Sequence, residues 1–174
     1  MNKKNIGLSI TLCVFFSLMG YSQNKMYLKL DGVDGDATDV NHRGWSNILS
    51  FENGISNSGA ISAGGSGAGK VRFSDMKLTK LVDKISPGLI RRAASGSHFR
   101  DVIIEITGPD SKPIYSIKLS DVFITNIITS AECNPACTAT EEVKLSFLKA
   151  TWEYRDKDGG IIKSGWDVKE NRAL

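Results

Sequence analysis

The segment Val143-Lys-Leu-Ser-Phe-Leu-Lys-Ala-Thr-Trp-Glu-Tyr154 decides the predicted fold, because its apolar positions change parity partway along. Apolar residues first occupy odd positions (Val143, Leu145, Phe147) and then even ones (Leu148, Ala150, Trp152, Tyr154). A slip of one residue would turn every later side chain of a strand to the wrong face. A β-bulge near Phe147 and Leu148 would repair this by adding one residue and bending the strand. Long, bent strands favour a barrel over a flat sheet.

Alternation of apolar and polar residues recurs along the rest of the chain and predicts further strands. These strands are expected around residues 26–30, 45–55, 71–82, 102–106, 115–119 and 161–168. The apolar stripe shifts between Phe73 and Met76, which suggests a second bulge. Gly108-Pro109-Asp110-Ser111 and Asp158-Gly159-Gly160 are turn signals, the second typical of a hairpin. The sequence therefore predicts a mainly β fold.

One short α-helix is expected at about residues 86–95. Ser86 is a favourable N-cap, Pro87 suits the first helical position, and Gly96 suits the residue just past the end. Leu89, Ile90, Ala93 and Ala94 recur at helical spacing. Such a helix could plug one end of a barrel or lie on its side, and periodicity does not choose between these positions.

The stretch at residues 122–128 is apolar on both faces, which a half-exposed strand would not be. The pattern places Val122, Ile124 and Ile128 on one face and Phe123 and Ile127 on the other. Either a second layer of the same chain, such as the helix, or another subunit must cover the second face. These five residues are therefore our candidate subunit interface.

The N-terminal residues match a secretory signal peptide. Lys3 and Lys4 precede a thirteen-residue uncharged stretch, residues 6–18, and small residues Gly20 and Ser22 precede a cleavage point after Ser22. The apolar stretch is shorter than the ~20 residues that span a bilayer, so no stable membrane anchor is expected. We expect export to the periplasm or the extracellular space, and a single domain at residues 23–174.

Cysteine usage agrees with an oxidising compartment. Cys13 would leave with the signal peptide, and Cys133 and Cys137 remain in Cys-Asn-Pro-Ala-Cys. An even pair in an exported chain predicts a disulfide, which here would fix a local turn. Free or intermolecular thiols are the alternative, and a zinc site would need two further ligands.

Composition and charge exclude several classes of protein. The 174 residues carry a formal net charge of +3, which falls to +1 without Lys3 and Lys4. This weak charge argues against a nucleic-acid partner. The run Gly64-Gly-Ser-Gly-Ala-Gly-Lys70 resembles a phosphate-binding loop, but Val71 stands where Ser or Thr should hold Mg²⁺, so a Gly/Ser loop is favoured.

Other candidate sites are equally weak. The acidic run Asp31, Asp34, Asp36 and Asp39 lacks the Gly and Glu positions of an EF-hand. The two histidines, His42 and His98, show no ligand spacing, and no catalytic set stands out. We therefore expect no enzyme, metal or cofactor. Trp45, Trp152 and Trp166 are expected in the core or at a barrel rim, although a sugar-binding platform is an alternative.

Seven segments of the chain share an order that is found in one protein family. They are Met26-Tyr-Leu-Lys-Leu-Asp-Gly-Val-Asp-Gly, Gly69-Lys-Val-Arg-Phe-Ser-Asp-Met, Val82-Asp-Lys-Ile-Ser-Pro-Gly-Leu, Leu119-Ser-Asp-Val-Phe-Ile-Thr-Asn, Val143-Lys-Leu-Ser-Phe, Trp152-Glu-Tyr and Gly165-Trp-Asp-Val-Lys-Glu-Asn. Together they resemble the haemolysin-coregulated protein (Hcp) family, the tube subunits of type VI secretion systems. No single segment is diagnostic, but their joint order is fairly specific and covers nearly all of residues 23–174.

The resemblance implies a β-barrel of two antiparallel sheets with one flanking helix. It also implies a hexameric ring of identical subunits, rings that stack into a hollow tube, a spike protein above the tube, and small effectors inside it. It brings no catalytic residues. The alternative function is an exported binding module, for example for glycans through Trp45 or Trp166, that reuses the barrel.

Overall fold

The computed structural model describes residues 23–57 and 71–174. The predicted signal peptide and the Gly/Ser loop at residues 64–70 lie outside the described residues. The elements are β1 (Lys25–Leu30), β2 (Ser46–Asn47), β3 (Ser50–Glu52), β4 (Ile55–Asn57), β5 (Val71–Phe73), β6 (Met76–Leu81), α1 (Ser86–Ser95), β7 (Phe99–Thr107), β8 (Pro113–Cys133), β9 (Cys137–Arg155), β10 (Ile161–Asp167) and β11 (Arg172–Ala173).

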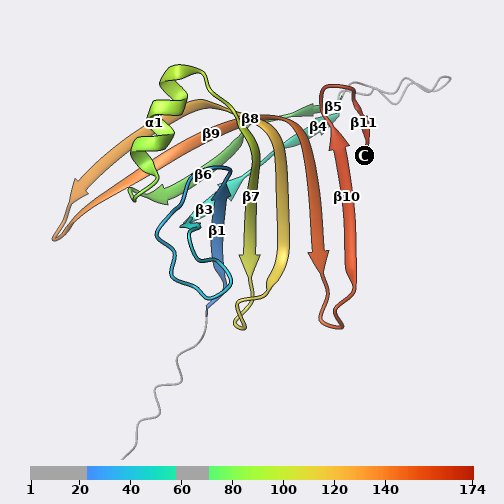
Figure 1. Ribbon diagram of the computed structural model, residues 1–174, viewed down its shortest axis with the longest axis horizontal. Helices are drawn as coiled ribbons and strands as arrows, with labels where there is room; N and C mark the ends of the chain where they lie inside the picture. Colours follow the sequence, from blue (N-terminus) through green and yellow to red (C-terminus); the bar gives the residue numbers. More distant parts are fainter. Residues whose placement is uncertain (1–22, 58–70) are drawn as a thin grey trace, which may run out of the picture.

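The strands form a barrel, and every strand pairing within the described residues is antiparallel. Strand β1 pairs with β7, β7 with β8, β8 with β9, β9 with β6, and β6 with β3. The short segment from β2 to β3 closes the ring, since the Ile48 N–H bonds to the Met26 carbonyl on one side and the Leu49 N–H to the Thr79 carbonyl on the other. A separate two-stranded sheet, β4–β5, lies beside it (Figure 1). The predicted fold class, a mainly β barrel with one flanking helix, is confirmed.

The change of parity after Phe147 occurs where it was predicted. Phe147 is buried, Leu148 is exposed, and the next buried residue of β9 is Ala150. At this level β9 also exchanges neighbours, from β6 along residues 140–145 to β10 along residues 149–155. Strand β9 therefore keeps β8 as its neighbour throughout and changes its other neighbour at the bend.

The predicted bulge near Phe147 and Leu148 is wrong, because the β8–β9 register does not shift there. Ser120 pairs with Lys149 and Val122 with Phe147 in one unbroken register, so the buried positions change parity at the same level on both strands. Asp121, opposite this point on β8, takes a positive φ of 54°. The register shift lies between Ile124 and Asn126, which makes Thr125 the extra residue.

The second predicted bulge, between Phe73 and Met76, is a break between two strands. Strand β5 pairs with β4, whereas β6 pairs with β3 and β9. Ser74 holds the break, since its backbone N–H bonds to the Gly54 carbonyl and its hydroxyl accepts the Gly54 N–H at 2.7 Å. The parity shift in the sequence thus marks a change of sheet.

The helix has the predicted bounds but begins differently. Ile85 is its N-cap residue, Ser86 is already helical, and the Ile85 N–H is bonded by the Asp83 carboxylate at 3.1 Å. Gly96 ends the helix with a left-handed φ of 67°, as expected. Ser86 is diverted from capping because its hydroxyl is buried and donates to Glu141 at 2.8 Å.

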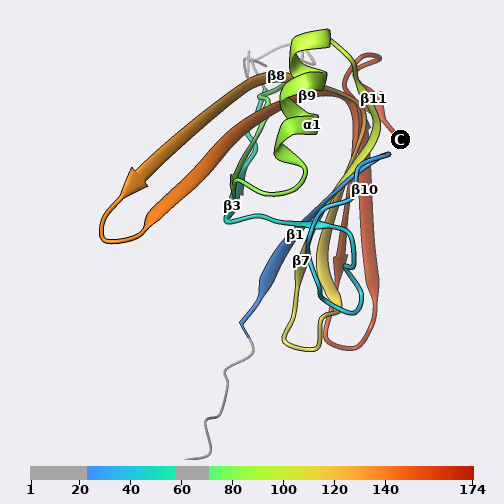
Figure 2. The ribbon, with the colours of Figure 1, turned by 60° about the vertical axis from the view of Figure 1, so that its left-hand side comes forward.

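The core lies inside the barrel and beneath α1. It is formed by apolar side chains from the strands and by Ile85 and Leu89 at the start of the helix. The helix lies on the side of the barrel against β8, and the ends of β8 and β9 extend beyond the barrel as a hairpin (Figures 1 and 2). We call residues 129–140 the arm.

Candidate self-association surface

An open groove of about 540 Å³ runs between α1 and β8. Its lining comes from one face of the helix and from the bulged part of the strand, namely Ile90, Ala93, Ala94, Ile124, Thr125, Asn126, Ile127 and Thr129. The alanines of the helix have short side chains, so they leave space open between α1 and the bulged part of β8. The result is a mainly apolar groove that no described part of the chain fills.

The five predicted interface residues divide into three groups. Val122 is fully buried in the core, so it offers no surface and leaves the candidate set. Ile124 and Ile127 are half-buried and line the groove, whereas Phe123 and Ile128 are 42% and 49% exposed. The predicted face assignment is wrong, because the Thr125 bulge shifts parity and places Ile127 with Ile124. The interface role of the remaining four stays a prediction.

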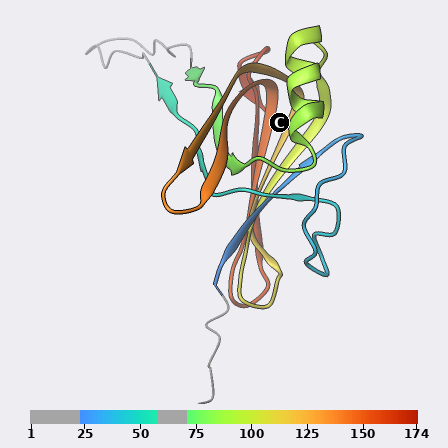
Figure 3. The same cartoon turned by 90° about the vertical axis from the view of Figure 1, so that its left-hand side faces the viewer.

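The arm continues from this region as a two-stranded ribbon. Strand β6 still supports its root, where Leu81 pairs with Thr140 and the Val82 N–H bonds to the Ala139 carbonyl. Ser130 pairs with Thr140, Ala131 with Ala139, and Cys133 with Cys137 at the end. No described strand pairs with the outer edge of β8 beyond Val122. Most of its side chains are exposed and small. Figure 3 shows the arm leading away from the side of the barrel that carries α1.

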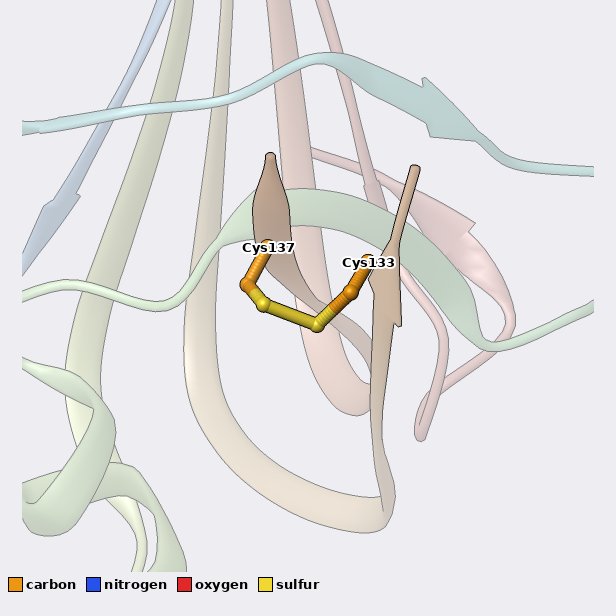
Figure 4. Close-up of a disulfide and its surroundings, with 2 residues drawn as sticks. All are labelled: Cys133 and Cys137. Carbon is orange, nitrogen blue, oxygen red and sulfur yellow. A yellow bond between two sulfur atoms is a disulfide. The ribbon is translucent and has the colours of Figure 1, made fainter. Parts of the chain in front are cut away.

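A disulfide joins Cys133 and Cys137 at the tip of the arm (Figure 4). The two Cα atoms are 3.8 Å apart, closer than the usual lower value of ~4.4 Å. Both cysteines are exposed, and Asn134 and Pro135 lie in the turn between them. The bridge therefore fastens the two strands at the exposed tip of the arm.

A buried ionic cluster fixes the root of the arm to the helix. The Lys80 ammonium on β6 donates to Asp83 at 2.7 Å and to Glu141 on β9 at 3.2 Å. Ser86 of α1 donates to the same Glu141, and Ser46 of β2 donates to Asp83. Four elements thus meet at one charge cluster.

Sequence reasoning missed this cluster, although a signal for it was present. Lys80 follows Met76 and Leu78 on the core-facing parity of β6, and Glu141 precedes Val143 on the core-facing parity of β9. Charged residues at inward positions are rarely buried without a partner. Two opposite charges at inward positions of different strands were therefore a candidate pair.

A second buried cluster holds the acidic loop that follows β1. The His42 ring stacks on Tyr27 with centroids 4.1 Å apart, and its two nitrogens face Asp39 at 3.0 Å and Glu105 at 2.8 Å. Hydrogen bonds from His42 and Ser111 hold the pKa of Asp39 well below its usual range. Burial, reinforced by the Asp39 charge, raises the pKa of Tyr27.

The three tryptophans that were candidates for a sugar-binding platform make contacts within the fold or are buried in it. Trp45 meets His42 edge-on at 4.9 Å, Trp152 stacks on Phe73 at 6.1 Å, and the indole nitrogen of Trp166 is buried. Within residues 23–57 and 71–174, no group of three His, Cys, Asp or Glu is arranged to hold a metal ion. No helix in the same ranges is long and apolar enough to cross a membrane.

These features define a class of protein: a small β-barrel that presents an apolar groove and a disulfide-closed arm. The charged groups of both buried ionic clusters form hydrogen bonds with one another and with neighbouring side chains. The two clusters therefore hold strands, loops and the helix together. The open surfaces are suited to contact with another macromolecule.

Comparison with known proteins assigns the family. The family model described as "Type VI secretion system effector, Hcp" matches residues 27–154. Protein hcp1 of Pseudomonas aeruginosa is 31% identical over 156 residues, which cover 84% of this chain and 96% of that protein. The chain belongs to the Hcp family of type VI secretion proteins.

Solved structures agree with this assignment. Hcp1 from Salmonella typhimurium superposes with a TM-score of 0.76 at 28% identity, covering 87% of this chain and 99% of that one. A structure described as a type six secretion system protein gives a TM-score of 0.80 at 28% identity, covering 87% and 100%. The predicted resemblance to the family is confirmed.

Proposed function

We propose that this chain is an exported, non-enzymatic subunit that assembles into rings of six copies. The rings stack into a hollow tube, which meets a spike protein at its end and carries small effectors. The observation that carries this proposal is the unfilled apolar groove between α1 and β8, present on a barrel of the Hcp family.

The groove and its surroundings favour association with other protein surfaces. Ile90 at its rim is 50% exposed, and the half-buried Ile124 and Ile127 line it from β8, so three large apolar side chains gather at one groove. Contiguous exposed apolar surface marks interaction sites on soluble proteins. The weak net charge permits identical copies to meet without strong repulsion.

Export through residues 1–22 completes the proposal. Removal of this segment leaves Cys133 and Cys137 as the two cysteines of the chain, and they are bonded to each other. Disulfides persist in the periplasm and outside the cell. The signal pattern and the disulfide therefore support the same destination.

Size-exclusion chromatography with light scattering on residues 23–174 tests the ring. We expect a mass six times that of one chain and annular particles in negative-stain images. Ile90→Asp at the groove should lower the mass, whereas Ile161→Asp on β10 should leave it unchanged. The two isoleucines are a matched pair, because they are 50% and 53% exposed. A stable wild-type monomer would refute the ring.

A further inference from the structure

The arm and the groove have complementary shapes. The groove is lined on the helix side by Ile90, Ala93 and Ala94, and is open to solvent. The arm presents narrow strands of Ala, Ser and Thr whose tip is closed by the disulfide. Small side chains let a ribbon approach another element closely, and a bridged ribbon loses less conformational entropy on binding.

Their charges are complementary as well. Glu132 is the one charged residue among residues 129–140, and it is exposed. Helix α1 carries Arg91 and Arg92 and no acidic residue. Arg91 is exposed and lines a separate hollow with Arg92, Ser95 and Ser97, on the helix face next to the one that carries Ala94. Arg92 is already engaged by the Phe99 ring and the His98 carbonyl.

The arm of a given copy cannot occupy the groove of that same copy. The groove ends at Thr129, which is the first residue of the arm. Four further residues of extended strand carry the tip about 13 Å beyond that point, at roughly 3.3 Å per residue. The disulfide and the continuous β8–β9 pairing hold the ribbon extended, so its tip points away from α1 (Figure 3).

We infer that the disulfide-closed arm of one copy docks in the α1–β8 groove of the next copy, with Glu132 meeting Arg91. This inference rests on the proposed ring, and it names the surfaces that join neighbouring subunits. A contact between two different surfaces is heterologous, and such contacts close into rings when the rotation allows.

Charge reversal at the two residues tests the contact. Glu132→Lys places a cation opposite Arg91, and Arg91→Glu places an anion opposite Glu132, so each should weaken association about tenfold or more. The double variant restores opposite charges and should regain the wild-type mass in light scattering over a dilution series. Lys157→Glu, exposed in the β9–β10 turn, is the matched control. Thermal unfolding by circular dichroism verifies that each variant is folded.

The outcomes separate this inference from the ring itself. Loss of association in both single variants and recovery in the double variant supports the contact, because a merely structural defect would not be repaired by a second reversal. Wild-type rings with both single variants unaffected overturn the contact and leave the ring standing. Single variants that dissociate without recovery in the double variant also overturn the Glu132–Arg91 pairing. A monomeric wild-type chain overturns both proposals.

Discussion

Lys80 Nζ and Glu141 Oε2 are 3.2 Å apart, and both side chains are almost completely buried. Lys77 and Glu142, from the same two strands, are also 3.2 Å apart, but their side chains are 40% and 30% exposed. Distance and residue types are the same in the two pairs. Burial, together with the hydrogen bonds of Asp83 and Ser86, is what distinguishes them.

The two pairs should differ strongly when one partner is removed. Glu141→Ala removes one of the two carboxylates that pair with the buried Lys80 ammonium. This change should lower the free energy of unfolding by about 3–5 kcal/mol. Lys77→Ala breaks the exposed pair and should cost less than about 1 kcal/mol. Urea denaturation of the two variants measures both values. Equal losses would show that the buried cluster does not hold the arm root as described.

Asp39 should make stability depend on acid pH. Because its pKa is depressed in the folded chain, its ionised form stabilises the fold at pH values above its ordinary pKa of 3.8. That contribution is lost progressively as the pH falls below 3.8. Asp39→Asn should therefore be destabilised at neutral pH, and its difference from wild type should shrink in acid.

Unfolding midpoints in urea between pH 7 and pH 2.5 check this prediction. Asp36→Asn, an exposed position in the same loop, serves as the control and should follow the wild type at every pH. A difference between Asp39→Asn and wild type that stayed constant with pH would contradict the linkage.

The disulfide should be detectable by mass and should affect the arm more than the barrel. Residues 23–174 should gain no mass from a thiol alkylating agent unless first reduced, and should then gain two groups. Because the bridge closes a very short loop, its removal by Cys133→Ser together with Cys137→Ser should cost at most about 2 kcal/mol. Protease cleavage within residues 129–140 should become faster, since an isolated hairpin is marginally stable. Alkylation without reduction would show that the thiols are free.

Two glycines should respond oppositely to alanine. A Cβ on Gly35 would collide with the backbone carbonyl of Trp45, which cannot move without breaking the Ala37 N–H bond to it. Gly35→Ala should therefore lower stability by about 1–3 kcal/mol. A Cβ on Gly88, in the first turns of α1, would meet only Val33 at 4.0 Å. Gly88→Ala should stabilise the chain by about 0.5–1 kcal/mol, and thermal unfolding measures both changes.

The fold class followed from local pattern because strands bury alternate side chains, and this periodicity is visible in one sequence. The alternation in β1, β7 and the long strands, the turn at Gly159 and the helix end at Gly96 were all predicted from adjacent residues. The parity change after Phe147 was also visible. Each of these features depends on residues within a few positions of one another.

The tertiary structure decided what depends on partners distant in the chain. The sequence showed that something changes at Phe147 and at residues 73–76, but a parity shift looks the same whether a strand bulges, bends together with its neighbour or passes to another sheet. It showed inward-facing Lys80 and Glu141 without showing that they meet. Residues 122–128 are apolar on both faces in the sequence, whereas in the structure Val122 is buried in the core and the Thr125 bulge places Ile127 with Ile124 in the groove. The alternation of side chains along a strand follows from the sequence, but the points where it shifts, and the surface that each side chain meets, are set by the pairing of strands far apart in the chain.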